Sequence, residues 1–160
     1  MREFKIVTPV RELSYNELEE TDRLLIDKAR EAAAGAYAPF SKFHVGAAIL
    51  MENGEIATGN NQENAAYPSG TCAERTALFH ASATRPGMAM RKIAVAAGNV
   101  DAGGKVMFQK TPISPCGSCR QALMEYEHRF GPIEVILYGS DKIYILPSVG
   151  ALLPFSFTEF

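Results

Sequence analysis

The sequence predicts an α/β domain in which a mixed five-stranded sheet lies between two layers of helices, giving three layers, α/β/α. Two observations lead to this fold class. Helical and strand-like segments alternate along the chain, which is typical of a sheet with helices on both faces. The last two strand-like segments are separated only by residues 139–142. This link is too short for a parallel crossover, so these strands should pair antiparallel.

The first predicted elements are a helix and a hairpin. Ser14 and Glu17 are spaced as a capping box at the start of a helix that ends before Gly35. Strands at residues 43–51 and 55–59 follow, and Asn53-Gly54 between them favours a type I′ turn. The apolar face of the helix comprises Leu18, Leu24, Leu25, Ala29, Ala32 and Ala33.

The second half of the chain continues the alternation. Thr71 should cap a second helix that extends to about Ala83, and the apolar run at residues 92–97 predicts a buried strand. Gly131-Pro132 should end the next helix. The remaining elements are a helix at residues 116–130 and two strands at residues 133–138 and 143–146.

The chain shows no repeat or linker that would divide it, so residues 1–160 should form a single domain. Residues 1–13 form an N-terminal extension, and the loops at residues 88–90 and 101–110 suggest no function. The C-terminal tail, residues 148–160, is unusually aromatic. Such a tail either covers an interface or folds back on its own core, and the sequence leaves both alternatives open. Its aromatic residues are Phe155, Phe157 and Phe160.

Composition narrows the ligand and the location. The formal net charge of −2 offers no basic surface for nucleic acid, so the ligand should be a small molecule. No apolar run approaches the roughly 18 residues that cross a membrane. The N-terminus lacks the apolar core of a signal peptide. We therefore expect a cytoplasmic protein that binds neither membrane nor nucleic acid.

All three cysteines lie at the starts of predicted helices. Cys72 begins the second helix, and Cys116 and Cys119 begin the third as a CxxC motif. Unpaired backbone N–H groups and the helix dipole favour the thiolate form at such positions. Because both helices follow strands of one sheet, their first turns can meet at one edge and bring three thiolates around a metal such as zinc.

A structural zinc site would need a fourth protein ligand. His80 and His128 lie too far along their helices from the cysteines, whereas His44, on a strand, stays open as a ligand. Without a fourth ligand, one coordination position is available for water, as in catalytic zinc sites. Glu74, two residues after Cys72, could accept a proton from that water.

Cys-Ala-Glu at residues 72–74 and Pro-Cys-Gly-Ser-Cys at residues 115–119 resemble the motif of zinc-dependent deaminases. The resemblance is wider than these motifs, and in it the chain is similar to the small homotetrameric cytidine deaminases. It covers AYAPFSKFHVGAA (36–48), NQENAAYPSGTCAERTALF (61–79), SPCGSCRQALMEY (114–126) and the closing LLPFSF (152–157).

The resemblance implies a cytidine deaminase-like fold and one Zn²⁺ per subunit, held by Cys72, Cys116 and Cys119. It implies hydrolysis of cytidine and deoxycytidine to uridine and deoxyuridine plus ammonia, in pyrimidine salvage. Zinc-bound hydroxide would attack C4 of the ring while Glu74 shuttles protons. Arg75 matches the residue that offsets the negative charge of the thiolates.

The same resemblance implies how the nucleoside is held. Asn61 and Glu63 would hydrogen-bond the ribose, and Phe43 would pack against the pyrimidine. The backbone groups of Ala73 and Ser114 would bind the polar edges of the base. An anionic carboxylate at the sugar would repel a 5′-phosphate, which favours nucleosides over nucleotides.

Tyr67 and Phe157 match residues that reach the site of a neighbouring subunit, which implies a homotetramer with shared sites and assigns the tail to an interface.

Two alternative functions stay open. The substrate could be another aminopyrimidine, such as a modified nucleoside or a cytosine-bearing antibiotic. The chain could also be a zinc-stabilised interaction domain without activity. A nucleic-acid editor is disfavoured because no Lys or Arg cluster is long enough to follow a phosphate backbone.

Overall fold

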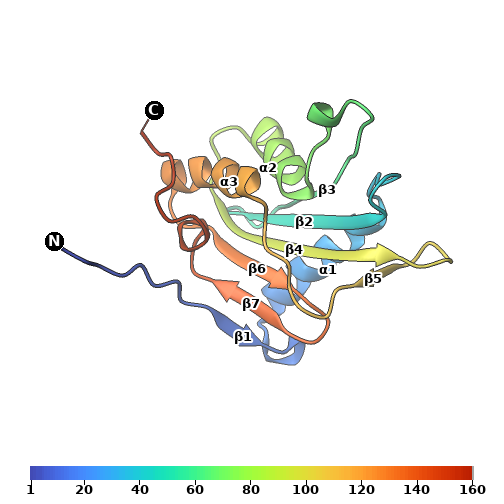
Figure 1. Cartoon of the computed structure of the whole chain (residues 1–160), viewed down its shortest axis with the longest axis horizontal. Coiled ribbons are helices and arrows are strands. Elements are labelled where there is room, and N and C mark those ends of the chain that lie inside the picture. Colours follow the sequence, from blue (N-terminus) through green and yellow to red (C-terminus); the bar gives the residue numbers. More distant parts are fainter. Residues whose placement is uncertain (160) are drawn as a thin grey trace.

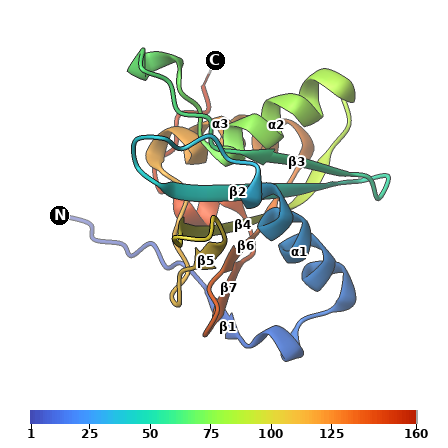
Figure 2. The same cartoon turned by 90° about the vertical axis from the view of Figure 1, so that its right-hand side faces the viewer.

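The computed structural model of the protein describes residues 1–159, so Phe160, a predicted part of the aromatic tail, lies outside the described residues. One sheet forms the middle layer (Figures 1 and 2). Helix α1 covers one face, and α2 and α3 cover the other, which confirms the predicted three layers. The helices span Glu20–Ala34 (α1), Ala73–Thr84 (α2) and Gly117–Phe130 (α3).

Within residues 1–159 the sheet has seven strands instead of the predicted five. The additional strands are β1 (Arg11–Leu13), in the N-terminal extension, and β5 (Val106–Phe108), in the loop that suggested no function. Each has only three residues, too few to show a pattern in the sequence, and exists because its backbone pairs with β7 or with the end of β4. The five predicted strands are present as β2 (Phe43–Met51), β3 (Ile56–Asn60), β4 (Met90–Val100), β6 (Glu134–Tyr138) and β7 (Ile143–Leu146).

The order of the strands is β1-β7-β6-β4-β2-β3, and β5 pairs with β4. β6 and β7 pair antiparallel, as predicted from their short link, and β4 and β6 are parallel. β3 and β4 are both antiparallel to β2, so they run in the same direction. Since α2 follows β3 and α3 comes after β4, the first turns of both helices lie at the same edge of the sheet.

The starts of the helices differ from the predicted ones. The capping box of Ser14 and Glu17 is present, but it caps a short 3₁₀ turn, and α1 begins only at Glu20. The N-cap of α2 is Cys72 and not Thr71. On α1, Leu24 is exposed, against the prediction. The buried face of α1 and the turn before it consists of Leu18, Leu25, Ile26, Ala29 and Ala33.

The hairpin between β2 and β3 also differs in its turn. Gly54 has a φ of +86°, but Asn53 does not have the positive φ that a type I′ turn requires. Gly54 N donates to Met51 O and Met51 N donates to Glu55 O. This is a three-residue loop with a type I turn followed by a left-handed glycine, so the type I′ prediction was wrong in its geometry.

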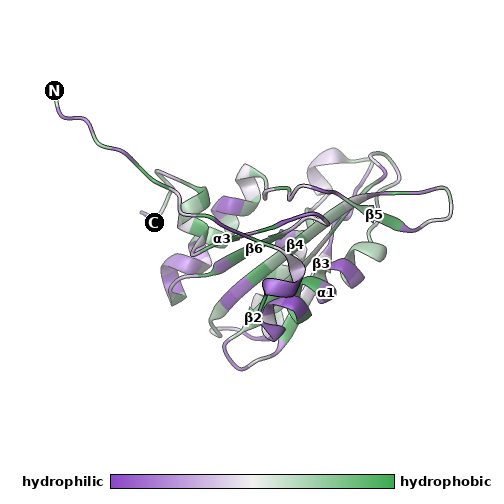
Figure 3. Ribbon diagram, turned by 90° about the horizontal axis from the view of Figure 1, so that it is seen from below, coloured by the Kyte–Doolittle hydropathy of each residue, from purple (hydrophilic) through white to green (hydrophobic). Residues whose placement is uncertain are grey.

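Two hydrophobic cores fill the spaces between the layers, one beneath α1 and one beneath α2 and α3. In Figure 3 the strands β4 and β6 are largely apolar, as expected for strands covered on both faces. A Cβ atom at Gly59 on β3 would overlap the backbone of α2 at Ala73 and Ala77. The glycine thus allows close packing of α2, and this fixes the height of Cys72 and Glu74 above the sheet.

The C-terminal tail divides into two parts. The 3₁₀ turn η3 (Val149–Leu152) folds back on the protein, and Val149 is fully buried. Further along, Phe155 and Phe157 are 85% and 66% exposed. The first part therefore follows the alternative of a folded-back tail. Among residues 1–159, no helix has both the length and the apolar character that crossing a membrane demands.

Candidate metal centre and active site

The three cysteine sulfurs lie together at the starts of α2 and α3. The Sγ atoms of Cys72 and Cys116 are 3.9 Å apart, those of Cys116 and Cys119 are 3.5 Å apart, and all three lie within 4.8 Å of one another. A tetrahedral zinc with Zn–S bonds of about 2.3 Å separates its sulfur ligands by about 3.8 Å. Both the spacing and the donor set fit zinc.

The cysteines reach this point because of their helix positions. Cys72 and Cys116 are the N-caps of α2 and α3, and Cys119 lies in the first turn of α3, buried. The free N–H groups of both helix starts surround the sulfurs with positive potential. Within residues 1–159, no histidine, aspartate or glutamate joins this metal-binding group.

Charge is distributed unevenly over the thiols when no metal is present. A hydrogen bond from Cys119, together with contact to Arg75, lowers the pKa of Cys72 to about 5. The same hydrogen bond to Cys72, with burial, raises the pKa of Cys119. One thiolate thus forms readily, and the neighbouring thiol retains its proton.

Arg75 lies one turn along α2 and faces the sulfurs. Its Nη2 is 3.9 Å from Cys72 Sγ, and that contact raises the pKa of the guanidinium further. Among the residues that the structure describes, the buried Nε atom of Arg75 has no hydrogen-bond partner, while the guanidinium interacts with the sulfurs of Cys72 and Cys119. A cation placed here can offset the surplus negative charge of three thiolates.

Glu74 is the carboxylate of the site. It is 5% exposed, and burial, as the largest cause, raises the pKa of its carboxyl group, to which the negative charge of Cys72 adds. A carboxyl group with a raised pKa can both accept and release protons near neutral pH. Glu74 lines the same cavity as Cys72 and Cys116.

That cavity has a volume of about 430 Å³, within the range of roughly 300–1,000 Å³ typical of small-molecule sites. Its walls come from the loops after β3 and before α3, the first turn of α2 with Cys72, Cys116 at the start of α3, and β2. Of the predicted substrate-binding residues, four line it: Asn61, Glu63, Tyr67 and Ser114.

Asn61 and Glu63 are held by backbone groups. Asn61 Oδ1 accepts from Val45 N at 2.8 Å, and its Nδ2 donates to Phe43 O at 2.9 Å. One N–H of the amide stays available. Glu63 Oε2 accepts from Phe40 N and Ser41 N, at 2.8 and 3.2 Å. A hydrogen bond from Ser41 is the largest cause that lowers the pKa of Glu63, so this carboxylate is ionised at neutral pH.

The other predicted binding residues do not line the cavity. Phe43 is half-buried and lies two residues before Val45 on β2, so both share the face of the sheet toward the cavity. Ala73 is buried, and its N–H is one of the free groups in the first turn of α2. Phe157 lies on the C-terminal tail, where its backbone bonds Gln121.

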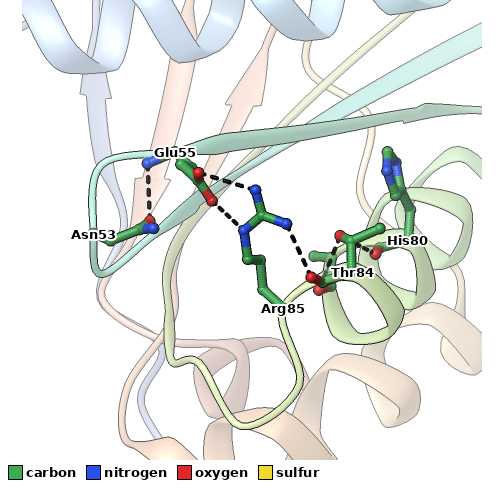
Figure 4. Close-up of polar contacts among 6 residues, drawn as sticks. Asn53, Glu55, His80, Thr84 and Arg85 are labelled. Carbon is green, nitrogen blue, oxygen red and sulfur yellow. Dashed lines mark hydrogen bonds and ion pairs between the residues drawn. The ribbon is translucent and has the colours of Figure 1, made fainter.

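The histidines lie elsewhere. His44 contacts Ala33 O through Nδ1, at 3.0 Å, on the α1 face of the sheet, and does not join the sulfurs. His80 lines a second cavity near the β2–β3 hairpin, and Figure 4 shows its ring above the far end of α2. There Arg85 forms a two-pronged ion pair with Glu55, at 2.6 and 3.0 Å, which attaches the end of α2 to the hairpin.

Several cavity residues were not predicted from the sequence. Phe40 lies edge-on to Tyr67, with the ring centroids 6.4 Å apart, and Val45, Thr71 and Ile113 also line the wall. For Val45 a signal existed, because it alternates with Phe43 along β2. Phe40, Thr71 and Ile113 lie in irregular segments, where no periodic pattern indicates the direction of a side chain.

Three convergent cysteines, a buried carboxyl group and an adjoining cavity define a zinc-dependent hydrolase. Residues 19–131 match the family model described as the cytidine and deoxycytidylate deaminase zinc-binding region. The chain belongs to this family of zinc-dependent deaminases, which confirms zinc as the predicted metal, and Cys72, Cys116 and Cys119 form the group that could hold it.

Individual relatives of the chain are named as members of the same family. A cytidine deaminase of Halalkalibacterium halodurans is 44% identical over 103 residues, or 64% of this chain and 70% of the relative. One from Sporosarcina psychrophila is 38% identical over 135 residues, or 84% and 90%. The crystal structure of a cytidine deaminase from Burkholderia pseudomallei superposes with a TM-score of 0.68 at 41% identity, covering 84% of this chain and 97% of the other.

Proposed function

We propose that this protein hydrolyses cytidine and deoxycytidine to uridine and deoxyuridine, releasing ammonia. The observation that carries the proposal is the cavity in which Cys72, Cys116 and Glu74 meet. Relatives named cytidine deaminases support the substrate class. A cytoplasmic role in pyrimidine salvage would accord with a free nucleoside as substrate.

The three cysteines would hold one zinc ion. When bound, zinc lowers the pKa of a water molecule and so provides a nucleophile near neutral pH. Arg75 would keep the surplus charge of the thiolates from weakening this effect, since it lies 3.9 Å from Cys72 Sγ.

Glu74 would carry the protons. It would accept one from the attacking water and deliver it to N3 of the pyrimidine while oxygen bonds to C4. It would then take the proton of the new C4 hydroxyl and transfer it to the amino group as the C4–N4 bond breaks, so that ammonia leaves and the C4 carbonyl of the product forms. Burial suits the carboxyl group to this task because it raises the pKa of Glu74 toward the pH at which the enzyme works.

The sugar would bind at Asn61 and Glu63. Glu63 has one oxygen held by the backbone of Phe40 and Ser41, which leaves the other to accept from a ribose hydroxyl. Asn61 would donate its remaining N–H. A carboxylate ionised at neutral pH would disfavour a 5′-phosphate beside it.

Phe43 would pack against the pyrimidine ring, and the backbone groups of Ala73 and Ser114 would bind its polar edges. Tyr67, which is 81% exposed, and Phe157 would complete the site of a neighbouring subunit in a homotetramer. Light scattering coupled to gel filtration tests the assembly separately from the reaction.

The test of the reaction is the loss of cytosine absorbance when zinc-loaded protein is incubated with cytidine, deoxycytidine or cytidine 5′-monophosphate. We expect conversion of both nucleosides and little conversion of the nucleotide. The Glu63→Gln variant tests the carboxylate directly. It should bind nucleosides more weakly, and its rates with cytidine and with cytidine 5′-monophosphate should differ less than those of the wild type. No turnover of either nucleoside would reject the proposal and direct the search to modified pyrimidines.

A further inference from the structure

The side chain of Arg120, in the first half of α3, connects two segments that are far apart in sequence. Its Nε donates to Pro115 O at 2.8 Å, and its Nη2 donates to Ser114 Oγ at 3.0 Å. Its Nη1 donates to Leu152 O, also at 2.8 Å. All three nitrogens of one guanidinium are therefore engaged, each by a different residue.

The two segments have different places in the protein. Ser114 and Pro115 precede Cys116 directly, and Ser114 lines the cavity. Leu152 is the last residue of η3, in the C-terminal tail. Arg120 thus connects the loop that presents Cys116 with the tail that carries Phe157.

The chemistry of the Arg120 guanidinium matters as much as its contacts. Within residues 1–159 no carboxylate lies at ion-pair distance from Arg120, so its three bonds go to neutral oxygens. The guanidinium is planar and its donors have a fixed geometry. It therefore sets the loop and the tail in one mutual orientation, which a flexible ammonium group could not do with three acceptors at once.

Two other side chains of α3 hold the same tail. The amide of Gln121 donates to Phe157 O at 2.7 Å and accepts from Phe157 N at 3.2 Å. The carboxylate of Glu127 accepts from Val149 N and Gly150 N, at 2.7 and 2.9 Å. The tail is thus attached to α3 at several points, and a tail fixed in this way is a firm support for Arg120.

We infer that Arg120 is a positioning residue that makes the geometry of the cysteine loop depend on the docked C-terminal tail. It holds Ser114 toward the cavity and Cys116 toward the other sulfurs, and does so only while Leu152 is in place. Within residues 1–159, the hydrogen bonds of Arg120 go to Ser114, Pro115 and Leu152, and none goes to Glu74 or Cys72 at the start of α2. Substrate affinity and zinc retention should therefore depend on Arg120 more than the proton transfers do.

The test compares Arg120→Met and Arg120→Lys with Arg129→Met, a matched control on the exposed part of the same helix. Hydrogen–deuterium exchange of residues 113–116 and 149–157 measures whether the cysteine loop and the C-terminal tail depend on each other, without any assumption about activity. Competition with a chelator reads zinc retention. The kinetic consequence rests on the proposed function and is read as the separate changes in KM and kcat for cytidine.

We expect Arg120→Met to speed exchange in both segments and to lower zinc affinity by about 10-fold, as loss of a group that orients a ligand does. KM should rise about 2- to 10-fold, the effect of one lost hydrogen bond, and more than kcat falls. Arg120→Lys should lie between this variant and the wild type. If Arg120→Met does not fold, the lysine variant provides the same comparison.

Exchange in both segments that equals that of Arg129→Met would overturn the inference, and so would faster exchange confined to one segment. A lysine variant indistinguishable from the wild type would also overturn it, because the fixed geometry of the guanidinium would then be irrelevant. If the wild type converts no cytosine nucleoside, the proposed function fails. Exchange and zinc retention still decide the role of Arg120 in that case.

Discussion

Cys72 and Cys116 occupy equivalent positions on different helices: each is the N-cap of its helix, and their sulfurs lie 3.9 Å apart. They meet because β3 and β4 run in the same direction, which brings the first turns of α2 and α3 to one edge of the sheet. The metal site therefore depends on the tertiary fold, and metal binding should in turn stabilise that fold.

Substitution Cys119→Ala should abolish stoichiometric zinc binding. Two thiolates cannot hold zinc as three do, and the chain has no fourth cysteine to replace the lost one. Metal analysis after gel filtration measures the zinc content. Ser118→Ala is the control, because Ser118 neighbours Cys119 on α3 and provides no ligand in the cluster. A full equivalent of zinc bound by the alanine variant with unchanged affinity would contradict the three-cysteine assignment.

Glu74→Gln should retain zinc and lose turnover by about 10²–10⁴-fold in kcat, the usual contribution of a general acid–base. The amide has nearly the same shape as the carboxyl group but cannot transfer protons. Steady-state kinetics together with zinc analysis separates the two effects. A variant with full zinc content and near-normal kcat would exclude Glu74 from proton transfer.

Much of the fold could be predicted because long elements leave a pattern. β2 and β7 were predicted with their observed ends, and the antiparallel pairing of β6 and β7 followed from their four-residue link. β1 and β5 could not be predicted, since three residues show no alternation and their pairing depends on distant strands. The start of α1 was misplaced because a capping box also fits a 3₁₀ turn.

The metal centre was predictable for a similar reason: a helix start has recognisable chemistry, and three cysteines at two such starts allow few arrangements. The walls of the cavity were less predictable from the sequence. Neither the bonds of Asn61 to β2 nor those of Arg120 to the tail could be predicted, because each joins segments whose distance apart in space is set by the whole fold. Local patterns carry no information on such contacts.

Arg75→Met should retain zinc but lower kcat/KM at neutral pH by about 10-fold, within the range seen for groups that support a metal ligand. A positive charge near the thiolates favours the deprotonated, active form of the site. Its removal should therefore move the acid limb of the kcat/KM profile to higher pH. Arg85→Met, at the other end of α2, is the control. An acid limb that stays in place would show that Arg75 does not tune the site.

In the zinc-free protein, Cys72 should react with iodoacetamide at nearly the same rate from pH 6 to pH 8. The pKa of Cys72 is lowered to about 5, so most of the thiol is already ionised at pH 6, whereas an ordinary thiol gains about 10-fold in thiolate per pH unit. Peptide mass spectrometry identifies the modified cysteine. A 10-fold rise per unit at Cys72 would contradict the lowered pKa, and zinc loading should protect Cys72 at every pH.

Glu127→Gln should destabilise the protein by about 1–3 kcal/mol, the cost of one buried donor left without a partner. Glu127 is 9% exposed, and its carboxylate accepts three backbone N–H groups: Ile133 and Val149 bond Oε2, and Gly150 bonds Oε1. The amide can satisfy the pair at one oxygen but then turns its own donors toward Gly150 N. Urea unfolding at a fixed zinc concentration measures the loss, and Glu125→Gln on the exposed side of α3 is the control. If both variants unfold at the same urea concentration, the carboxylate does not hold η3 to α3.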